Sequence, residues 1–401
     1  MPGAPRLPQT GPLSRRAVLG AGALGALALA GCSTSGSGST GSGTTSSATT
    51  PGSSSTTASG STTSAPSAPS ATRAALSAPA DVATGLEVPW SGAVLPDGAV
   101  LVSERETALV KRIPPGGGGV ETVGTVEGVD PGGEGGLLGL AVDPATFATK
   151  PVLYAYFTAG SDNRVVTIAL DGGRFGAQNP IITGIPKGSI HNGGRLKFGP
   201  DGFLYVTTGE SARTGLAQDL NSLGGKILRV TTSGEPAPGN PFPGSRVWTY
   251  GHRNVQGIAW SANGQMWASE FGQNTWDELN VITPGSNYGW PDVEGVAGQN
   301  GFLDPVRQWT TDQASPSGIC IGPDGSVLMA ALRGESLWKI PVNADGSTGE
   351  PQRLLDGQYG RLRDVFVGPD GNVWVITNNT ARGQARDGDD RIVKLPQSLT
   401  G

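Results

Sequence analysis

The sequence predicts an all-β fold, a six-bladed β-propeller, preceded by a signal peptide and a disordered tether. Three observations predict the propeller. Short runs that alternate apolar and polar residues, rich in Val, Ile, Leu, Trp and Tyr, fill the chain from about residue 75 to residue 396. One turn sequence recurs before many of these runs. The spacing of these turns matches the size of a propeller blade.

The strand pattern is clearest in five runs, at residues 99–103, 203–207, 265–268, 326–329 and 372–376. A Pro-Asp-Gly turn ending at Gly98, Gly202, Gly325 or Gly371 precedes four of them, and an Ala-Asn-Gly variant ending at Gly264 precedes the other. Proline and the short Asp or Asn side chain favour the turn, and glycine accepts the positive φ before the next strand. The turns therefore predict hairpins.

The spacing of these turns predicts the number of blades. Their central residues lie at 97, 201, 263, 324 and 370, which gives gaps of 104, 62, 61 and 46 residues. A four-stranded blade needs roughly 45–60 residues, so the longest gap has room for a further blade around residues 137–155. A pair of β-sandwiches is the alternative, but identical recurring turns favour radial repetition, and the length suggests six blades.

The first 31 residues predict an export signal that ends before Cys32. Arg15 and Arg16 precede an apolar run over residues 17–30, which is shorter than the ~20 residues of a membrane span. The arginine pair suggests the twin-arginine route. Leu-Ala-Gly-Cys at 29–32 resembles a bacterial lipobox, which implies cleavage before Cys32 and lipidation of its thiol. The alternative is an ordinary signal peptide with a chance cysteine.

Residues 32–75 are predicted to be the lipidated cysteine followed by a disordered linker, and residues 76–398 to be the propeller. Residues 33–72 contain only Ser, Thr, Gly, Ala and Pro, which cannot form a core. Without residues 1–72 the chain has a formal charge of −8 and one cysteine, Cys320, so no disulfide can form within the folded part. We expect Cys320 to be a buried strand residue.

Composition excludes several classes of protein. The 65 glycines and 31 prolines argue against a helical bundle or coiled coil. Two cysteines and two histidines are too few for a disulfide scaffold or a zinc protein with several sites. The formal charge of −5 argues against a nucleic-acid partner.

The two histidines are the first candidate catalytic residues. His191 and His252 both lie in polar, glycine-rich segments beside predicted strands, where propellers place loops near the central channel. A neutral imidazole can accept a proton near neutral pH, so either is a chemically sensible base. Taken alone, a loop histidine is more often structural than catalytic.

Two further segments suggest ligands. Residues 269–280 and 285–291 combine carboxylates, amides and glycine-exposed carbonyls, which suit Ca²⁺, although an acidic loop is usually only solvated. Arg361 and Arg363 lie on one face of a predicted strand, where two guanidinium groups repel unless an anion bridges them. A multi-carboxylate ligand would serve, and the alternative is a solvated edge with partners such as Asp364.

Together these segments resemble the pyrroloquinoline-quinone (PQQ)-dependent sugar dehydrogenases of the glucose/sorbosone dehydrogenase type, which are six-bladed propellers. The resemblance covers the whole chain after the tether. It is carried by the order and spacing of Gly-Gly-Leu-Leu-Gly at 135–139, the His191 segment, Gly-Gly-Lys-Ile-Leu-Arg at 224–229, Gly-His-Arg-Asn at 251–254, residues 278–290, and Arg-Leu-Arg-Asp at 361–364.

The resemblance implies roles for individual residues. His191 matches the general base that takes the proton of the anomeric hydroxyl while hydride moves to the quinone. Arg253 and Asn254 match the pair beside the reacting quinone, where a cation stabilises developing negative charge. His252 has no proton-transfer role in that motif and is read as structural. The remaining positions implied to contact the cofactor are Glu134, Arg333, Arg361 and Arg363.

The resemblance also implies two calcium sites. Gly272 and Gln273 match positions whose main-chain carbonyls hold a cofactor-bound Ca²⁺ that acts as a Lewis acid, and Glu278 and Tyr288 match ligands of a second, structural Ca²⁺.

Three positions depart from the family pattern. Arg333 replaces a lysine. Glu134 replaces a glutamine, and we expect its carboxylate to be protonated, to be paired with an arginine, or to alter specificity. Ile190 replaces an aspartate before the base, which removes a possible orienting group.

The implied function is oxidation of an aldose at its anomeric carbon to the lactone, with electrons passed to an external acceptor. PQQ and Ca²⁺ are the implied cofactors, a sugar is the implied substrate, and the lipid anchor is the only expected membrane contact. The implied location is outside the cytoplasm, as a membrane-anchored lipoprotein. Two alternatives stay open: a non-catalytic cell-surface binding propeller, and a Ca²⁺-dependent lactonase, which would need metal-bound carboxylates at the channel mouth rather than an arginine pair.

Overall fold

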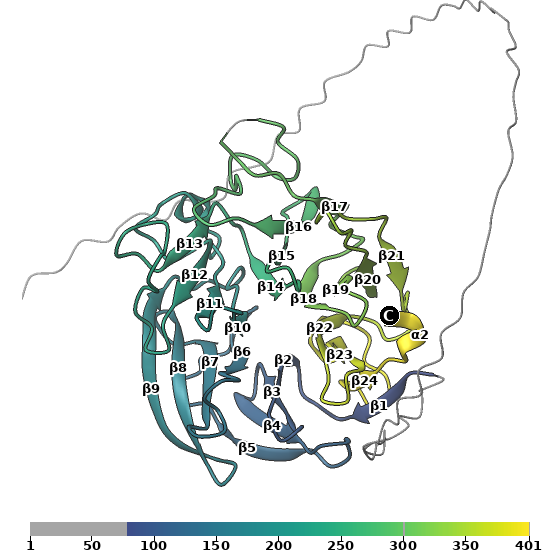
Figure 1. Ribbon diagram of the computed structural model, residues 1–401. Coiled ribbons are helices and arrows are strands. Elements are labelled where there is room, and N and C mark those ends of the chain that lie inside the picture. Colours follow the sequence, from purple (N-terminus) through teal and green to yellow (C-terminus); the bar gives the residue numbers. More distant parts are fainter. Residues whose placement is uncertain (1–77, 300, 401) are drawn as a thin grey trace, which may run out of the picture. The chain divides into compact units, whose positions relative to one another are not determined.

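The computed structural model describes residues 78–299 and 301–400, and these form six four-stranded antiparallel sheets arranged around a central axis (Figure 1). The innermost strand of each sheet lies at the axis, and the later strands lie progressively outward. The predicted all-β, six-bladed β-propeller is therefore confirmed. The predicted signal peptide, Cys32 and tether lie outside the described residues.

Each blade is a run of consecutive strands, except the last. From the innermost strand outward, the first blade is β2 (Pro89–Val94), β3 (Val100–Glu104), β4 (Leu109–Ile113) and β5 (Glu121–Thr125), and the second is β6 (Leu137–Val142), β7 (Val152–Thr158), β8 (Asn163–Asp171) and β9 (Arg174–Ile185). The third blade is β10 (Leu196–Phe198), β11 (Leu204–Thr207), β12 (Lys226–Val230) and β13 (Val247–Tyr250), and the fourth is β14 (Val255–Trp260), β15 (Met266–Glu270), β16 (Trp276–Ile282) and β17 (Arg307–Thr310). The fifth blade is β18 (Pro316–Ile321), β19 (Val327–Ala331), β20 (Ser336–Ile340) and β21 (Gln352–Leu354), and the sixth is β22 (Leu362–Val367), β23 (Val373–Thr377), β24 (Ile392–Lys394) and β1 (Ala80–Ala83).

The last blade closes the ring by joining the two ends of the folded chain. β1 is its outermost strand and pairs antiparallel with β24, with Ala80 opposite Lys394 and Asp81 opposite Val393. The ring closure leaves no blade incomplete, because the first strand of the fold supplies the fourth strand of the sixth sheet.

The predicted turns connect the innermost strand to the second strand in five blades. In the first, Gly98 has φ +84°, and the Asp97 carboxylate accepts a hydrogen bond from the Ala99 N–H at 2.9 Å. The turns at Asp201, Asp324 and Asp370, and at Asn263, repeat this bond to the residue two positions on. The second blade lacks the turn and connects β6 to β7 by a longer segment, in the gap where a further blade was expected.

The hydrophobic core lies between neighbouring blades. Leu101 and Val110 of the first blade, for example, pack in one cluster with Leu153 and Val166 of the second. Burying a side chain of this size stabilises the fold by about 1.5–3 kcal/mol. Cys320 lies on β18 and is 4 % exposed, as predicted.

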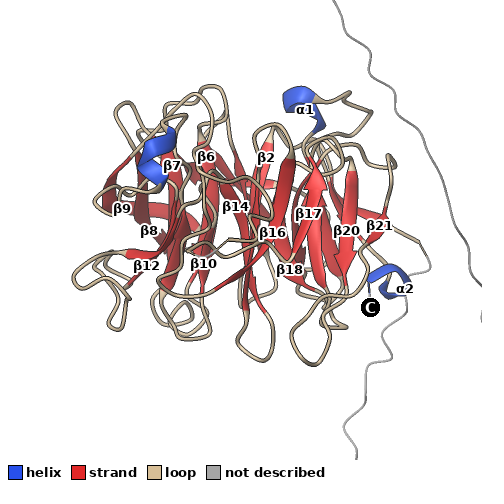
Figure 2. Ribbon diagram, turned by 90° about the horizontal axis from the view of Figure 1, so that it is seen from above, coloured by secondary structure: helices blue, strands red, loops and turns tan. Residues whose placement is uncertain are grey.

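Helical structure is confined to three single turns in the described residues. They are η1 (Thr214–Ala217), α1 (Asn379–Arg382) and α2 (Gln397–Thr400), and Figure 2 shows α1 and α2 on opposite faces of the disc. None of the helices between residues 78 and 400 is long and apolar enough to cross a membrane. The innermost strands all run in the same direction, so the segments that precede them meet at one end of the central channel.

Candidate active site

A cavity of about 270 Å³ opens where the segments before the innermost strands converge. The segment before β10 contributes His191, the segment before β14 contributes Arg253 and Asn254, and the start of β22 contributes Arg361 and Arg363. Glu134 and Arg333 also line this cavity. The structure thus brings together every residue that the sequence analysis assigned to catalysis or to cofactor binding, although these residues come from five blades.

The side chain of His191 is held by Glu210, a residue that sequence reasoning missed. The Nδ1 atom of His191 makes a short contact with Glu210 Oε1, and both side chains are buried. The carboxylate accepts the Nδ1–H, so the other ring nitrogen, Nε2, remains available as a base. Ile190 itself supplies no orienting group, and Glu210 takes that part from the loop after β11.

The backbone at His191 is also fixed from two sides. Its φ is +57°, in the left-handed region, which is costly for a residue with a side chain. The Glu134 carboxylate accepts the His191 N–H at 3.0 Å, and the Ser211 N–H donates to the His191 carbonyl at 3.1 Å. Gly209 packs so closely that an added Cβ would lie 2.0 Å from the His191 carbonyl oxygen.

Glu134 is paired with an arginine, which is one of the three outcomes expected for a glutamate at this position. One oxygen accepts the His191 N–H, and the other lies 3.8 Å from Nη1 of Arg382. Its negative charge is therefore engaged by this chain's own groups at the edge of the cavity.

Arg253 and Asn254 are positioned by Glu270, the last residue of β15. The carboxylate of Glu270 accepts the backbone N–H groups of Arg253 and Asn254 and contacts Nδ1 of His252 at 2.8 Å. The Asn254 side-chain oxygen accepts the Gly193 N–H at 2.9 Å, so its amide NH₂ is the end left for a ligand. Burial lowers the pKa of Arg253, whose Nε has no hydrogen-bond partner in the described structure.

Arg361 and Arg363 face the cavity side by side, as the strand alternation predicted. Arg363 is 6 % exposed and donates to the amide oxygens of Gln256 at 2.9 Å and Asn378 at 3.0 Å, and no carboxylate of the described residues pairs with it. Burial lowers its pKa well below the ordinary value, and the neighbouring charges of Arg105 and Arg361 lower it further. The Nε atoms of both Arg361 and Arg363 are buried, and no group in residues 78–299 and 301–400 accepts a hydrogen bond from them.

This charge arrangement fits a small molecule with several carboxylates. Among the described residues, one carboxylate, Glu134, and six arginines line the cavity; the arginines are Arg105, which also pairs with Glu106, and Arg253, Arg333, Arg361, Arg363 and Arg382. Buried cations without counter-ions are costly, and a bound polyanion would compensate them. Arg105 follows β3 and Arg382 ends α1, and both were missed because neither segment carries a recognisable motif.

His252, the rival base, lies outside the cavity lining. It is fully buried, its Nε2 contacts Thr249 Oγ1 at 2.9 Å, and its Nδ1 contacts Glu270. Its ring stacks on Tyr288 with centroids 4.6 Å apart. Both ring nitrogens are engaged, so His252 has no nitrogen free to take a substrate proton.

The predicted position for a cofactor-bound calcium is a loop at the edge of the cavity. Gly272 lines the cavity, and Gln273 is exposed beside it. Their N–H groups donate to Asp277 at 2.8 Å and Glu294 at 2.6 Å, while within the described chain their carbonyls accept no hydrogen bond. Free carbonyl oxygens fit the hard-ligand preference of Ca²⁺.

The predicted second calcium site is less complete. Glu278 and Tyr288 line a void of about 10 Å³ together with Glu270 and Glu294. Burial, and then the charge of Glu270, raise the pKa of Glu278. The Tyr288 hydroxyl, however, donates to the Val281 carbonyl at 2.8 Å and accepts the Thr283 N–H at 2.8 Å. In residues 78–299 and 301–400, no group of three or more His, Cys, Asp or Glu side chains is arranged to hold a metal.

Comparisons with known proteins agree with this site. The sequence model of the glucose/sorbosone dehydrogenase family matches residues 86–386. A solved structure of the PQQ-bound form of aldose sugar dehydrogenase from Streptomyces coelicolor is 54 % identical, covers 80 % of this chain and 99 % of that one, and superposes with a TM-score of 0.76.

Two curated relatives extend the likeness. An aldose sugar dehydrogenase of Escherichia coli K12 is 31 % identical over 74 % of this chain and 88 % of its own length. Quinoprotein glucose dehydrogenase B of Acinetobacter calcoaceticus is 32 % identical over 52 % of this chain and 51 % of its own length. With a matching family model, a matching fold and the expected residues gathered in one cavity, the chain belongs to the glucose/sorbosone dehydrogenase family.

Proposed function

We propose that this protein oxidises an aldose at its anomeric carbon to the lactone, with PQQ and Ca²⁺ as cofactors and an external electron acceptor. The observation that carries the proposal is the cavity itself: a histidine with one free ring nitrogen shares it with Arg253, Arg361 and Arg363, and the described residues supply no carboxylate partner to these three arginines. The solved relative from Streptomyces coelicolor is a PQQ-bound form, which supports the same cofactor here.

His191 is the proposed general base. Because Glu210 accepts the Nδ1–H, Nε2 presents a lone pair that can take the proton of the anomeric hydroxyl. Once protonated, the imidazolium is stabilised by the adjacent Glu210 carboxylate, which is fully buried. Glu210 therefore acts through His191 and is a positioning residue.

The arginines are the proposed cofactor clamp. Arg361 and Arg363 would bind carboxylates of the cofactor, and Arg253 and Asn254 would lie beside its reacting carbonyl. The chemistry that bound PQQ supplies is a two-electron oxidation, with Ca²⁺ as Lewis acid. Gly272 and Gln273 would hold that ion through carbonyl oxygens, and Glu278 would contribute to a second, structural ion.

We also propose that the protein acts outside the cytoplasm as a lipoprotein. The arginine pair and the lipobox-like Leu-Ala-Gly-Cys ending at Cys32 support export and lipidation, and the linker would hold the propeller off the membrane. An electron acceptor in or near the membrane fits that location. Expression of Cys32→Ala in a bacterial host should release the protein from the membrane fraction, and continued membrane retention would contradict the lipid anchor.

The catalytic proposal is tested by reconstitution. The purified chain is loaded with PQQ and Ca²⁺, a panel of aldoses is added, and reduction of a dye acceptor is followed. We expect turnover in the wild type and a loss of at least about 100-fold in His191→Gln, since a positioned base contributes 10²–10⁴-fold.

Cofactor titration separates the possible failures. His191→Gln should still bind PQQ, because His191 is not part of the arginine clamp. PQQ binding without turnover on any aldose would favour the non-catalytic binding propeller. Absence of PQQ binding would refute the quinoprotein assignment, and hydrolysis of lactones without quinone would favour the lactonase.

A further inference from the structure

A second cavity, of about 550 Å³, lies at the other end of the central channel, and no residue of it belongs to the site described above. It is lined by the later residues of the same innermost strands, such as Val94 of β2, Leu140 of β6, Ala259 of β14 and Val367 of β22. Because these strands all run in one direction, their starts face the first cavity and their ends face the second.

A buried polar layer separates the two cavities. Arg195 donates to Asp364 at 2.8 Å, to Ser91 Oγ at 3.0 Å and to the Gln256 carbonyl at 2.9 Å. The Gln256 side chain in turn accepts from Arg363 on the first cavity's side. The two cavities are therefore distinct sites, and a molecule in one does not occupy the other.

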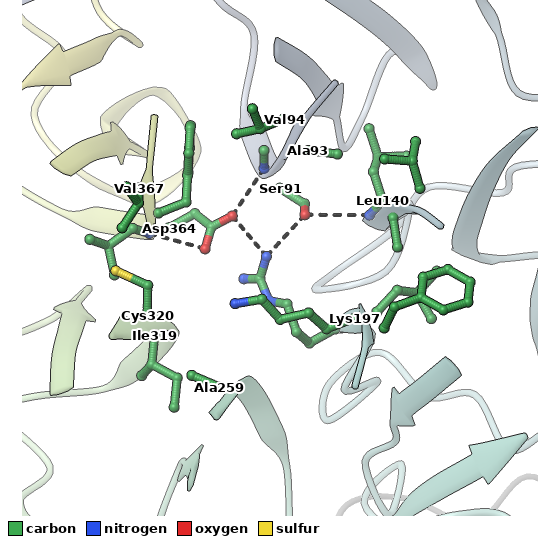
Figure 3. Close-up of a pocket in the computed structure, with 18 of the residues that line it drawn as sticks. Ser91, Ala93, Val94, Leu140, Lys197, Ala259, Ile319, Cys320, Asp364 and Val367 are labelled. Carbon is green, nitrogen blue, oxygen red and sulfur yellow. Dashed lines mark hydrogen bonds and ion pairs between the residues drawn. The ribbon is translucent and has the colours of Figure 1, made fainter. Parts of the chain in front are cut away.

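The walls of the second cavity are mainly apolar. Figure 3 shows Val94, Leu140, Ala259, Ile319 and Val367 around it, with the Cys320 side chain among them. Desolvation raises the pKa of the Cys320 thiol to about 12, so this sulfur is a neutral, apolar part of the wall. The volume lies within the ~300–1,000 Å³ of pockets that bind small molecules.

Charge is not balanced in this cavity. Arg195 and Asp364 form an ion pair at its floor, and the Nη2 of Arg195 is buried with no acceptor among the residues that the structure describes. Lys197 reaches toward the middle of the cavity, and within the described part of the chain its ammonium group makes one hydrogen bond, a long one of 3.4 Å to the Ile258 carbonyl. Desolvation lowers the pKa of Lys197, because burial in this cavity disfavours the charged ammonium form. The lining therefore holds two cations and one carboxylate.

We propose that the second cavity is a binding site for a small apolar molecule that carries one carboxylate. The apolar part would occupy the space between the strand ends, and the carboxylate would pair with the Lys197 ammonium. A carboxylate there forms a charge-assisted hydrogen bond and supplies the missing negative charge. A neutral apolar molecule would fill the same volume but leave Lys197 without a counter-ion.

The test compares two probes of equal shape, naphthalene-2-carboxylate and its neutral carboxamide. Each is titrated into the PQQ-loaded protein by calorimetry, with fluorescence of Trp260, which lines the cavity, as a second readout. Loading with PQQ keeps the carboxylate out of the arginine cavity. We expect saturable binding of the carboxylate and binding at least about ten-fold weaker for the carboxamide.

Variants locate the binding. Lys197→Met should weaken carboxylate binding about ten-fold or more and leave the carboxamide unchanged, whereas Lys197→Arg, which keeps the charge, should retain most of the affinity. Lys150→Met, an equivalent change at an exposed lysine, should have no effect. The proposal fails if no saturable carboxylate binding occurs below about 1 mM, if Lys197→Met binds like wild type, or if the two probes bind equally.

Discussion

Replacing Glu210 by glutamine tests whether this residue tunes the proposed base. The substitution keeps the shape of the side chain and removes its charge, so the contact with Nδ1 of His191 loses its charge assistance. Both side chains are buried, with exposed fractions of 11 % for His191 and 1 % for Glu210, so solvent does not screen the loss. A hydrogen bond to a charged group contributes about 1.5–3 kcal/mol, which corresponds to roughly a 10- to 150-fold fall in kcat/KM.

Parallel measurements separate a catalytic effect from simple damage. Glu210 does not line the cavity, so Glu210→Gln should lower kcat and leave PQQ affinity and the thermal unfolding midpoint close to the wild-type values. The assay is dye reduction at saturating PQQ and Ca²⁺, with PQQ affinity and the thermal unfolding midpoint measured in parallel. An unchanged kcat/KM in Glu210→Gln, or a loss explained wholly by weaker PQQ binding or unfolding, would refute the reasoning.

Three further substitutions test the clamp, a buried lysine and the packing at the base. Arg363→Met should weaken PQQ binding at least about ten-fold in calorimetry, and unchanged PQQ affinity would contradict the arginine clamp. The cofactor-free variant should keep the unfolding free energy of the wild type, because relief of the repulsion between cations offsets the loss of two hydrogen bonds to amide oxygens. Burial lowers the pKa of Lys226 to about 7, although its Nζ donates to three carbonyls, so above pH 7 the unfolded chain binds more protons than the folded one. Between pH 7 and 10 the unfolding free energy of the wild type should therefore rise relative to that of Lys226→Met, by up to about 1.4 kcal/mol per pH unit in urea unfolding. The same pH dependence of the unfolding free energy in both proteins would contradict this prediction. Gly209→Ala should cost more than about 2 kcal/mol, because its Cβ would meet the backbone of His191, whereas Gly215→Ala, with open space around it, should be tolerated.

The fold was predictable because its strongest signals are local. The turn residues Asp97, Asp201, Asn263, Asp324 and Asp370 each bond to a backbone N–H two positions on, so the sequence around each turn specifies the hairpin without help from the rest of the chain. The closing strand β1 was not predictable in the same way, because its partner β24 lies at the other end of the fold.

The site was predictable in its residues but not in its contacts. His191, Arg253 and Arg363 were identified through the family resemblance, which carries their positions but not their partners. Glu210 sits in an unremarkable loop after β11 and acquires its role only when that loop meets the His191 segment. The second cavity could not be predicted for a related reason. The apolar residues at the ends of the innermost strands have the sequence pattern of a hydrophobic core, and they line a cavity only because the six blades are arranged in a ring.

The pairing of β1 with β24 sets an order of events during synthesis. Ala80 and its partner Lys394 are 314 residues apart. At a synthesis rate of about 5–20 residues per second, β1 is therefore made roughly 15–60 s before the strand with which it pairs. Five blades can form while that strand is still unpaired, and the sixth cannot. The ring is thus locked by its earliest residues only after its last ones have been made.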